Sequence, residues 1–427
     1  MNDYWLQNAL KALEVTRAAD CPPLEFLSVE SGAAPKWTER ADALGTGAGV
    51  VVRTSGSTGT PKQTLLSWEA LEASAEMTAQ ALGGHGQWLL ALQPSYVAGL
   101  AVLSRSLVGG TEPVSLLEQT TDPDRFSKAA EQLTADRRFV SLVPTQLQRL
   151  LTRPSQRLLA ALRRFDAILL GGAPTNAELF DHARGLDLNV IRTYGMAETC
   201  GGCVYDGYPL PGVTVELGTH GRVLLSGPMV ALGYHEDPEL TAEKFEWAPD
   251  ARSPQSTPLR LEEADDHQGR QRRFRTDDLG ELSTQRATEV DTIAQVSGAG
   301  HSAQIVPRLT VTGRADSVLI TGGVKVSAEE IRRALESHPS VREAFVAGVD
   351  DAEWGQKVVA AVVFSTASRG GNVFEELDQL ISDRLSPAAV PKHYELLGGL
   401  PLLPNGKPDR QALIEMLERG AAHGQNP

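Results

Sequence analysis

Hydrophobic and polar positions alternate along the first half of the chain in a manner typical of α/β proteins. The apolar run at 49–52 predicts a buried strand. Segment 67–82 has apolar residues at helical spacing behind Ser67, a residue type that caps helices. The pattern therefore predicts a domain in which helices cover sheets. By the same criteria, further strands are expected at 88–92, 139–143 and 167–170, and helices at 98–107, 144–151 and 158–164.

The pattern changes after Gly201. Short alternating segments at 212–216, 221–226 and 279–283 predict a β-rich subdomain, interrupted by two hydrophilic stretches that we interpret as exposed loops, 248–273 and 285–307. From about Ser317 the pattern predicts a compact α+β unit. Its expected strands are 318–321, 342–349 and 357–365, and its expected helices are 328–337 and 374–385.

We therefore expect an α/β protein with two domains. The large N-terminal domain, 1–315, would combine αβ-layered sheets with the β-rich subdomain. The small C-terminal α+β domain would span 316–427.

Composition narrows the class of protein. Hydrophobic residues make up 41% of the 427 positions and charged residues 22%, which is typical of a soluble globular chain. The net charge of −14 argues against a nucleic-acid-binding module. No apolar run approaches the ~18 residues of a membrane span, and the N-terminal residues lack a signal-peptide pattern. Three cysteines in a chain of this length favour a reducing, cytoplasmic location over a disulfide scaffold.

The stretch RTSGSTGTPK, residues 53–62, directly follows the first predicted strand. A Gly/Ser/Thr loop between a strand and the next element presents N–H groups and hydroxyls to an anion. The stretch lacks the Walker A pattern, because Lys62 follows Pro61 and precedes Gln63. On its own, such a loop is as often a plain turn as a phosphate site.

Further short motifs follow this loop along nearly the whole chain. In order, they are GGAP at 171–174, YGMAET at 194–199, SGP at 226–228 with GY at 233–234, TDD at 276–278, GRAD at 313–316 and PNGK at 404–407. Taken together, they resemble the acyl-adenylate-forming ligases, the family of acyl-CoA synthetases, luciferases and peptide-synthetase adenylation domains.

This resemblance implies a two-step reaction that uses ATP, Mg²⁺ and coenzyme A. A carboxylate would attack the α-phosphate of ATP to give acyl-AMP and pyrophosphate, and a thiol would then displace AMP. Glu198 would hold Mg²⁺, a cation that prefers carboxylate and phosphate oxygens, and Thr199 would contact the α-phosphate. The resemblance further assigns the β,γ-phosphates to Thr54, Ser55, Gly56, Ser57, Thr58, Gly59 and Lys62, and adenine to Gly171, Gly172, Ala173, Tyr194 and Gly195. Asp278 would bind the ribose hydroxyls, and Arg314 would be a second contact to ribose or to phosphate.

The resemblance also implies a catalytic lysine in the second domain. Lys407 would bridge the substrate carboxylate and the α-phosphate during adenylation, where its charge offsets the repulsion between two anions. The C-terminal domain would rotate about a hinge at Asp316 between the two half-reactions.

Each residue also has a simpler interpretation. Taken singly, Glu198 is an ordinary surface carboxylate, Asp278 a cap residue, Lys407 a turn lysine and Arg314 one half of an interface ion pair. The pair Cys200 and Cys203 has C-x-x-C spacing, but a zinc site needs more ligands, so we interpret both as packing residues.

Three segments narrow the choice of carboxylic acid. Segments 194–213, 320–331 and 400–410 resemble the o-succinylbenzoate–CoA ligases, the branch of the family that serves menaquinone biosynthesis. The resemblance implies o-succinylbenzoate as the substrate, with Gly201 and Gly202 leaving room for its ring. Tyr96, in the element Tyr96-Val97-Ala98-Gly99, stands where the family usually has His, and we place Tyr96 and Gly99 at this substrate pocket.

Three alternatives stay open at this point. Another aromatic carboxylate–CoA ligase or a stand-alone enzyme that adenylates amino acids would share most of these motifs. A nucleotide-binding pseudoenzyme would have lost at least one of Glu198, Asp278, Arg314 and Lys407, all of which are present. Homodimerisation follows from analogy with the family only.

Overall fold

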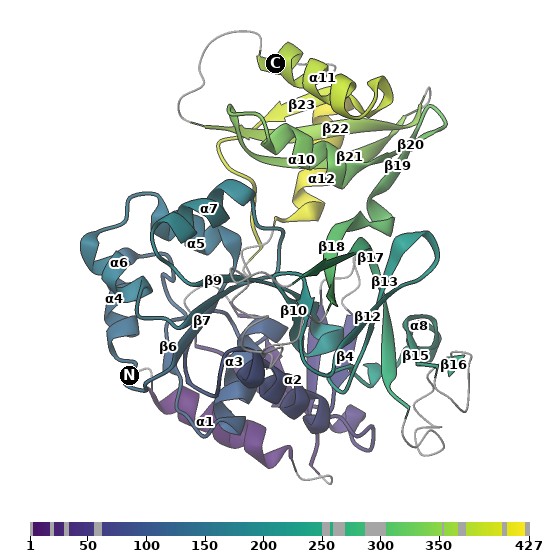
Figure 1. Cartoon of the computed structure of the whole chain (residues 1–427). Coiled ribbons are helices and arrows are strands. Elements are labelled where there is room, and N and C mark those ends of the chain that lie inside the picture. The colour runs from purple at the N-terminus through teal and green to yellow at the C-terminus, as the bar shows by residue number, and fades with distance from the viewer. Residues whose placement is uncertain are drawn as a thin grey trace. The chain divides into compact units, whose positions relative to one another are not determined.

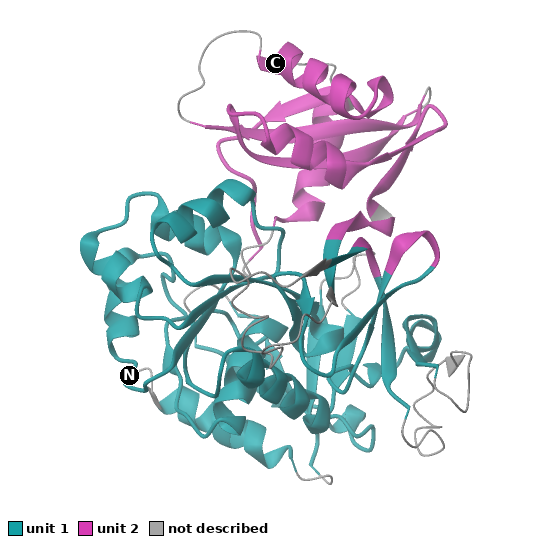
Figure 2. Ribbon diagram, viewed as in Figure 1, with its two compact units in different colours: residues 1–218, 223–276, 282–310 teal, residues 219–222, 277–281, 311–427 magenta. Residues whose placement is uncertain are grey.

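The computed structural model describes residues 3–17, 21–29, 34–54, 62–249, 257–258, 270–286, 305–351, 354–365, 373–403 and 408–422. The chain forms two compact units (Figure 2). The first contains residues 1–218, 223–276 and 282–310, and the second contains 219–222, 277–281 and 311–427. We expected a boundary between residues 315 and 316, whereas the second unit begins at 311 and takes in two short earlier segments.

Among the described residues, a seven-stranded sheet forms the centre of the first unit (Figure 1). Its order is β11-β10-β9-β8-β7-β5-β6. The strands from β9 to β6 run parallel, and β10 and β11 complete the sheet as antiparallel strands. The bounds are β5 (Gln87–Leu90), β6 (Val114–Ser115), β7 (Arg138–Leu142), β8 (Ala167–Leu170), β9 (Val190–Met196), β10 (Gly201–Tyr205) and β11 (Tyr208–Pro209).

Apolar residues at consecutive positions of β5, β7 and β8 pack into cores on both faces of this sheet. Successive side chains point to opposite faces, so Trp88 and Leu90 pack into one core and Leu89 into another. Helices α1 (Asp3–Val15), α2 (Trp68–Ala81) and α3 (Val97–Val108) line the first core. Helices α4 (Pro123–Glu131), α5 (Pro144–Leu151), α6 (Gln156–Leu162) and α7 (Ala177–Gly185) line the second.

A smaller sheet of five strands also belongs to the first unit and has the order β14-β4-β3-β1-β2. Val50 and Val52 face the larger core, whereas Val51 packs with Leu65 and Ala43 on the other side. Its edge strand comes from a distant part of the sequence. The bounds are β1 (Leu24–Leu27), β2 (Lys36–Glu39), β3 (Val50–Thr54), β4 (Lys62–Leu66) and β14 (Gly233–Tyr234).

The β-rich subdomain expected after Gly201 is present. Its strands are β12 (Thr214–Leu217), β13 (Arg222–Ser226), β15 (Phe245–Trp247), β16 (Thr257–Pro258), β17 (Arg272–Arg286) and β18 (Ile305–Arg314), accompanied by helix α8 (Pro238–Lys244). The loop interpretation of 248–273 and 285–307 is wrong where β16, β17 and β18 enter these stretches. Most of the remainder lies outside the described residues.

The second unit has its own sheet, covered on both faces. Alternating residues of β21 and β22 divide between a core with α10 and α11 and a core with α12. Together with the first unit, this confirms the expected α/β fold with a small C-terminal α+β part. The bounds are β19 (Val318–Thr321), β20 (Val324–Ser327), β21 (Val341–Asp351), β22 (Gly355–Phe364), β23 (His393–Leu396), α10 (Ala328–Glu336), α11 (Val373–Arg384) and α12 (Arg410–Ala422).

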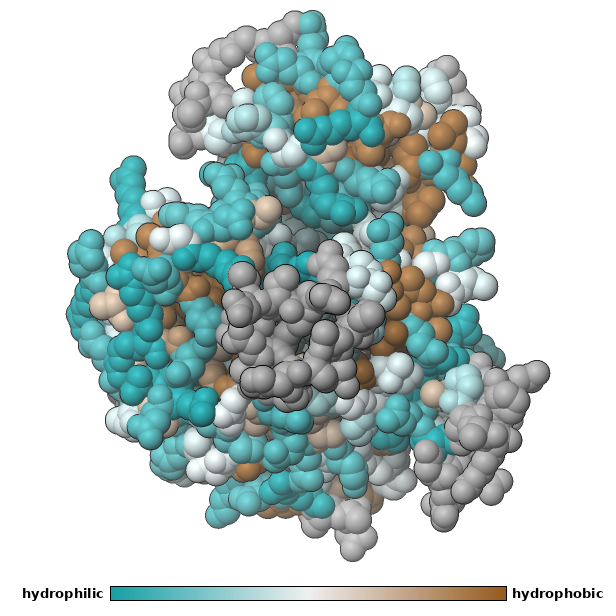
Figure 3. All heavy atoms as spheres, in the orientation of Figure 1, coloured by the Kyte–Doolittle hydropathy of each residue, from teal (hydrophilic) through white to brown (hydrophobic). Residues whose placement is uncertain are grey.

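Hydrophilic residues cover most of the face seen in Figure 3, with smaller hydrophobic areas between them. Within the described ranges, no helix combines the length and the hydrophobicity required to cross a membrane.

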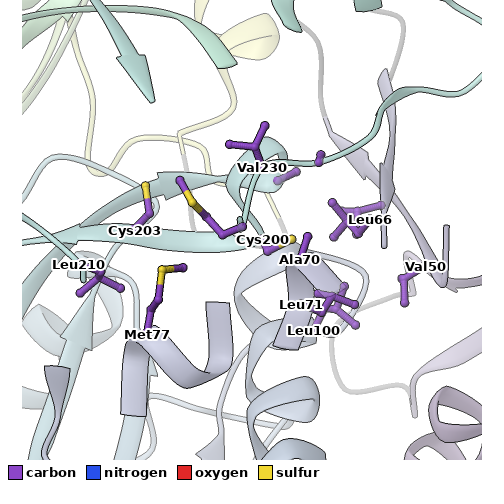
Figure 4. Close-up of a cluster of buried hydrophobic side chains, with 14 of the residues drawn as sticks. Val50, Leu66, Ala70, Leu71, Met77, Leu100, Cys200, Cys203, Leu210 and Val230 are labelled. Atoms are coloured by element: carbon purple, nitrogen blue, oxygen red, sulfur yellow. The ribbon is translucent and has the colours of Figure 1, made fainter. Parts of the chain in front are cut away.

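Cys200 and Cys203 lie in the larger core beside Met77, Leu100 and Val230 (Figure 4). Burial raises the pKa of each thiol to about 12, so both stay protonated at neutral pH. Their surroundings are those of packing residues, as we interpreted them.

We predict that, at pH 8, iodoacetamide will modify Cys21 in the native protein and reach Cys200 and Cys203 only after unfolding, because only the thiolate reacts. Since burial raises both pKa values above that of the unfolded chain, stability present below about pH 8.5 should decline between there and about pH 12. Mass spectrometry of labelled peptides and urea unfolding at several pH values measure the two effects. Rapid native labelling at Cys200 would contradict the assignment.

Candidate active site

The carboxyl ends of parallel strands meet at one edge of the seven-stranded sheet, and ligands of open α/β sheets bind at such edges. Gly171–Ala173 follow β8 there, and Tyr194 and Gly195 end β9 beside them. Gly171 N–H donates to Leu142 O at 3.2 Å, and a Cβ on Gly171 would lie 2.4 Å from Thr193 Oγ1. The structure thus brings together the segments expected to hold adenine, with glycine required at 171.

A tight hairpin joins β9 to β10 through the 3₁₀ turn η2 (Ala197–Thr199). Gly195 and Gly202 are cross-strand partners, and a Cβ on Gly195 would lie 2.0 Å from Gly201 O. The turn ends with Cys200 and Gly201 at φ 52° and 106°, in the left-handed region that favours glycine. Close backbone approach therefore fixes the hairpin that presents Glu198.

Thr199 stabilises this turn from within. Its fully buried hydroxyl accepts a hydrogen bond from Met196 N–H at 3.0 Å and donates to Gly201 O at 2.7 Å. These bonds explain a threonine at this position without any ligand. Its contact with an α-phosphate stays a prediction.

Glu198 lies at the junction between the hairpin and the smaller sheet. Tyr234 Oη donates to Glu198 Oε1 at 2.8 Å, and Ala231 N–H donates to Glu198 O at 2.9 Å. The Nζ of Lys62 lies 5.5 Å from the centre of the Tyr234 ring, a cation–π distance. One tyrosine thus connects the carboxylate expected to hold Mg²⁺ with the lysine expected near the phosphates.

The strand pair β3–β4 carries the two ends of the phosphate loop. Thr54 and Lys62 are direct cross-strand partners, so the loop between them starts and finishes at one point of the sheet. Lys407 and the loop residues Ser55, Gly56, Ser57, Thr58 and Gly59 lie outside the described residues, and their roles stay predictions.

Tyr96 and Gly99 lie where β5 leads into α3. Tyr96 is half-buried, and burial raises the pKa of its hydroxyl, an effect that a hydrogen bond with Ser28 partly offsets. A Cβ on Gly99 would lie 2.3 Å from Gln93 O, so this helix start also requires glycine.

Arg105, which our sequence analysis missed, is a buried cation beside Gly201. It is 5% exposed, its guanidinium lies 5.0 Å from the Trp88 ring centre, and Nη2 donates to Tyr205 Oη at 3.4 Å. A Cβ built on Gly201 would lie 3.9 Å from Nη2. Within the described part of the chain, its Nε has no hydrogen-bond partner and no carboxylate lies within ion-pair distance. As the one charged residue in the apolar run 98–107, it offered a signal in the sequence.

The second unit holds the residues expected at ribose. Arg314 Nη1 lies 3.5 Å from Asp278 Oδ1, and Asp278 is largely buried. The adjacent Asp277 pairs with Arg222 at 3.1 Å on the other side of β17. Asp316 lies in the 3₁₀ turn η5 (Ala315–Ser317) after Arg314, and its role as a hinge stays a prediction.

Comparisons with known proteins agree with this arrangement. The family model of AMP-binding enzymes matches residues 50–235, and the model of their C-terminal domain matches 330–407. A probable 2-succinylbenzoate–CoA ligase of Mycobacterium tuberculosis is 38% identical over 368 residues, covering 86% of this chain and 83% of the relative. The chain belongs to the AMP-binding enzyme family. The AMP-binding model includes every site residue named above in the first unit from Thr54 to Tyr234.

Other AMP-binding enzymes extend this comparison. The 2-succinylbenzoate–CoA ligase of Escherichia coli is 30% identical, covering 86% of this chain and 68% of the relative. A solved o-succinylbenzoate CoA synthetase from Bacillus subtilis, in complex with an acyl-adenylate intermediate, has a TM-score of 0.60 at 24% identity, with 86% and 69% coverage. An amide bond synthetase from Marinactinospora thermotolerans has a TM-score of 0.64 at 25% identity, with 89% and 71% coverage. These structures share the fold of the chain.

We predict that Tyr234→Phe will lower the free energy of unfolding by about 1–3 kcal/mol, because a buried carboxylate loses a hydrogen-bond donor. Tyr4→Phe, at a side chain that is 77% exposed, is the matched control and should change nothing measurable. Urea unfolding of both variants provides the comparison. Equal stability of Tyr234→Phe and the wild type would contradict the contribution assigned to this bond.

Proposed function

We propose that this AMP-binding enzyme is an ATP-dependent acid–thiol ligase that converts o-succinylbenzoate, ATP and CoA to o-succinylbenzoyl-CoA, AMP and pyrophosphate. The substrate is the one named, as 2-succinylbenzoate, for the relatives in M. tuberculosis and E. coli. The reaction would serve menaquinone biosynthesis in the cytoplasm. As expected from the family, the chain would act as a homodimer.

The observation that carries the choice of acid is the buried guanidinium of Arg105. A cation that lacks a carboxylate partner among the described residues pays a desolvation cost without the usual compensation. An anionic group of a substrate would supply that compensation. o-Succinylbenzoate has two carboxylates, so one can react with ATP while the aromatic one pairs with Arg105.

Glycine at 201 and 202 supports the same placement. Gly201 lies next to Arg105 and Ala101, and Gly202 lies next to Thr193. The hydroxyl of Thr193 donates to Leu170 O, directly before the segment expected to hold adenine. A Cβ on Gly202 would lie 3.1 Å from Thr193 Cβ, so the backbone packs closely there and favours glycine. A Cβ on Gly201 would make only ordinary contacts, and the absence of a side chain at this position would leave the space beside Arg105 to the aromatic ring of the substrate.

The remaining residues would hold and orient ATP. Lys62 and the loop 55–59 would bind the β,γ-phosphates, Asp278 and Arg314 the ribose, and Glu198 a Mg²⁺ ion. A single buried carboxylate fits Mg²⁺, which usually binds one or two carboxylates together with phosphates and water. Bound there, Mg²⁺ would offset negative charge on the phosphates. Lys407 would neutralise the approach of the substrate carboxylate to the α-phosphate.

The test is pyrophosphate release with a panel of acids, with and without CoA. We predict a preference for o-succinylbenzoate over 4-oxo-4-phenylbutanoate, the same acid without the aromatic carboxylate. In Arg105→Met the KM for o-succinylbenzoate should rise about 30-fold or more, because the aromatic carboxylate of the bound substrate loses its cationic partner. Arg138→Met, at an arginine whose Nε is also unpartnered, is the matched control and should leave KM unchanged. A wild-type preference for benzoate or an amino acid would overturn the proposed substrate.

We further predict that Lys407→Ala will slow acyl-adenylate formation about 100- to 1,000-fold, because one stabilising cation leaves the transition state. Thioester formation from supplied acyl-adenylate and CoA should stay close to the wild-type rate. Rapid-quench measurement of the two half-reactions separates these effects. An equal loss in both steps would refute this role for Lys407.

A further inference from the structure

A connected set of charged groups lies beside the phosphate loop and takes no part in the chemistry proposed above. Glu25 of β1 is 1% exposed and pairs with both Arg40 and Arg53. Arg40 Nε also donates to Asp42 Oδ1 at 2.9 Å. The Oδ2 of Asp42 lies 3.0 Å from Nε2 of His235, a residue that is 8% exposed. We call these five residues the ionic chain.

The ionic chain is anchored at both ends of the phosphate loop. Arg53 immediately precedes Thr54, the last residue of β3, so its pair with Glu25 fixes the strand that enters the loop. At the exit, His235 N–H donates to Gln63 O at 2.8 Å, next to Lys62. The two strand ends that flank the loop are thus connected through five charged or titratable residues, of which Glu25, Arg40 and His235 are buried and Asp42 and Arg53 are about half exposed.

The same chain reaches Glu198 through one further residue. Tyr234 precedes His235, pairs with Thr64 across β14 and β4, and donates to Glu198. Rotation of β14 about its axis would move the Tyr234 ring away from Lys62 and its hydroxyl away from Glu198. The contact between His235 and Asp42 opposes such rotation, because it ties the next residue of the chain to η1 (Ala41–Ala43).

The charges suit a role in positioning. Arg40 holds the pKa of Asp42 well below its usual range, so this carboxylate stays ionised throughout the neutral range. Ion pairs of this kind are weak evidence for a contribution to stability, because desolvation offsets most of the attraction. Fixing two elements in one geometry is a better-supported use of buried polar groups.

We propose that the ionic chain Arg53–Glu25–Arg40–Asp42–His235 positions Tyr234 and the two residues that flank the phosphate loop, Thr54 and Lys62, for binding Mg²⁺–ATP. In this proposal Asp42 and His235 are positioning residues, because they act through Tyr234 and the two ends of the loop. The inference rests on the proposed function for the identity of the nucleotide and concerns that substrate alone. It is independent of which acid the enzyme activates.

The experiment compares His235→Leu, His235→Gln and Asp42→Ala in the full chain. His235→Leu removes the contact with Asp42, whereas His235→Gln retains a side-chain N–H group to donate to it. The ion pair of His85 with Glu76, at 3.3 Å, provides a matched control on the surface of the first unit through His85→Leu. Calorimetry measures the Kd for Mg²⁺–ATP, steady-state kinetics measure KM for ATP, acid and CoA, and urea unfolding measures stability.

We predict that His235→Leu and Asp42→Ala will raise the Kd for Mg²⁺–ATP about tenfold, the effect of losing one charge-assisted hydrogen bond. His235→Gln should recover most of that loss, His85→Leu should match the wild type, and KM for acid and CoA should change less than about twofold. The proposal is overturned if nucleotide affinity is unchanged, or if all three KM values rise together with a lower unfolding midpoint and His235→Gln gives no recovery.

This design separates the two proposals. If the wild type forms no adenylate with any acid while the variants still weaken Mg²⁺–ATP binding as predicted, the proposed function fails and the positioning role stands. If the wild type adenylates o-succinylbenzoate and the variants bind Mg²⁺–ATP normally, the proposed function stands and the positioning role fails. A wild-type chain that binds no Mg²⁺–ATP overturns both.

Discussion

Two-sided burial of the parallel strands is the constraint on which the first unit depends. Because β5, β7 and β8 are apolar at consecutive positions, each strand needs helices on both of its faces. That requirement sets the strand directions and gathers the carboxyl ends at one edge. The glycine-rich segment after β8 and the hairpin after β9 lie at this edge because each directly follows the carboxyl end of its strand.

Tyr234 connects the five-stranded sheet of the first unit to the seven-stranded sheet through a side-chain hydrogen bond. It belongs to the edge of the smaller sheet, yet its hydroxyl reaches the turn at the end of the larger one. The carboxylate of Glu198 therefore accepts a hydrogen bond from a strand that lies far from it in the sequence. A geometry that suits the phosphates and their cation would therefore depend on both sheets at once.

The sequence predicted those helices and strands in which the apolar residues repeat with one clear period. The run 49–52 and the helix behind Ser67 are confirmed, and Ser67 caps α2 by accepting from Ala70 N–H. It left α1, α4, α7, α8 and α12 unassigned, because the sequence alone does not show which surface their apolar residues pack against. It also misjudged parts of the hydrophilic stretches, because a charged residue of β17 such as Arg273 is buried through ion pairs with Glu216 and Glu246.

The part of the candidate site that local sequence motifs encode could be predicted from the sequence. Such motifs point to Glu198 and Asp278, whose roles stay predictions; in the structure Glu198 accepts from Tyr234 and Asp278 pairs with Arg314. Tyr234 and Arg105 were not predicted as site residues, because their importance comes from contacts between residues far apart in the sequence. Thr199 shows the opposite case, since a motif residue with a predicted ligand contact also has a complete structural explanation.

Arg105 also carries a consequence for how the enzyme evolves. A buried cation whose counter-ion comes from a substrate, as we propose for Arg105, would lower the stability of the empty protein, so affinity for the acid would be gained at the expense of the fold. Selection for stability alone would replace it with a hydrophobic residue of similar size. At a position where the fold by itself would favour leucine or methionine, the proposed pairing with the substrate gives a reason for an arginine in an otherwise apolar helix.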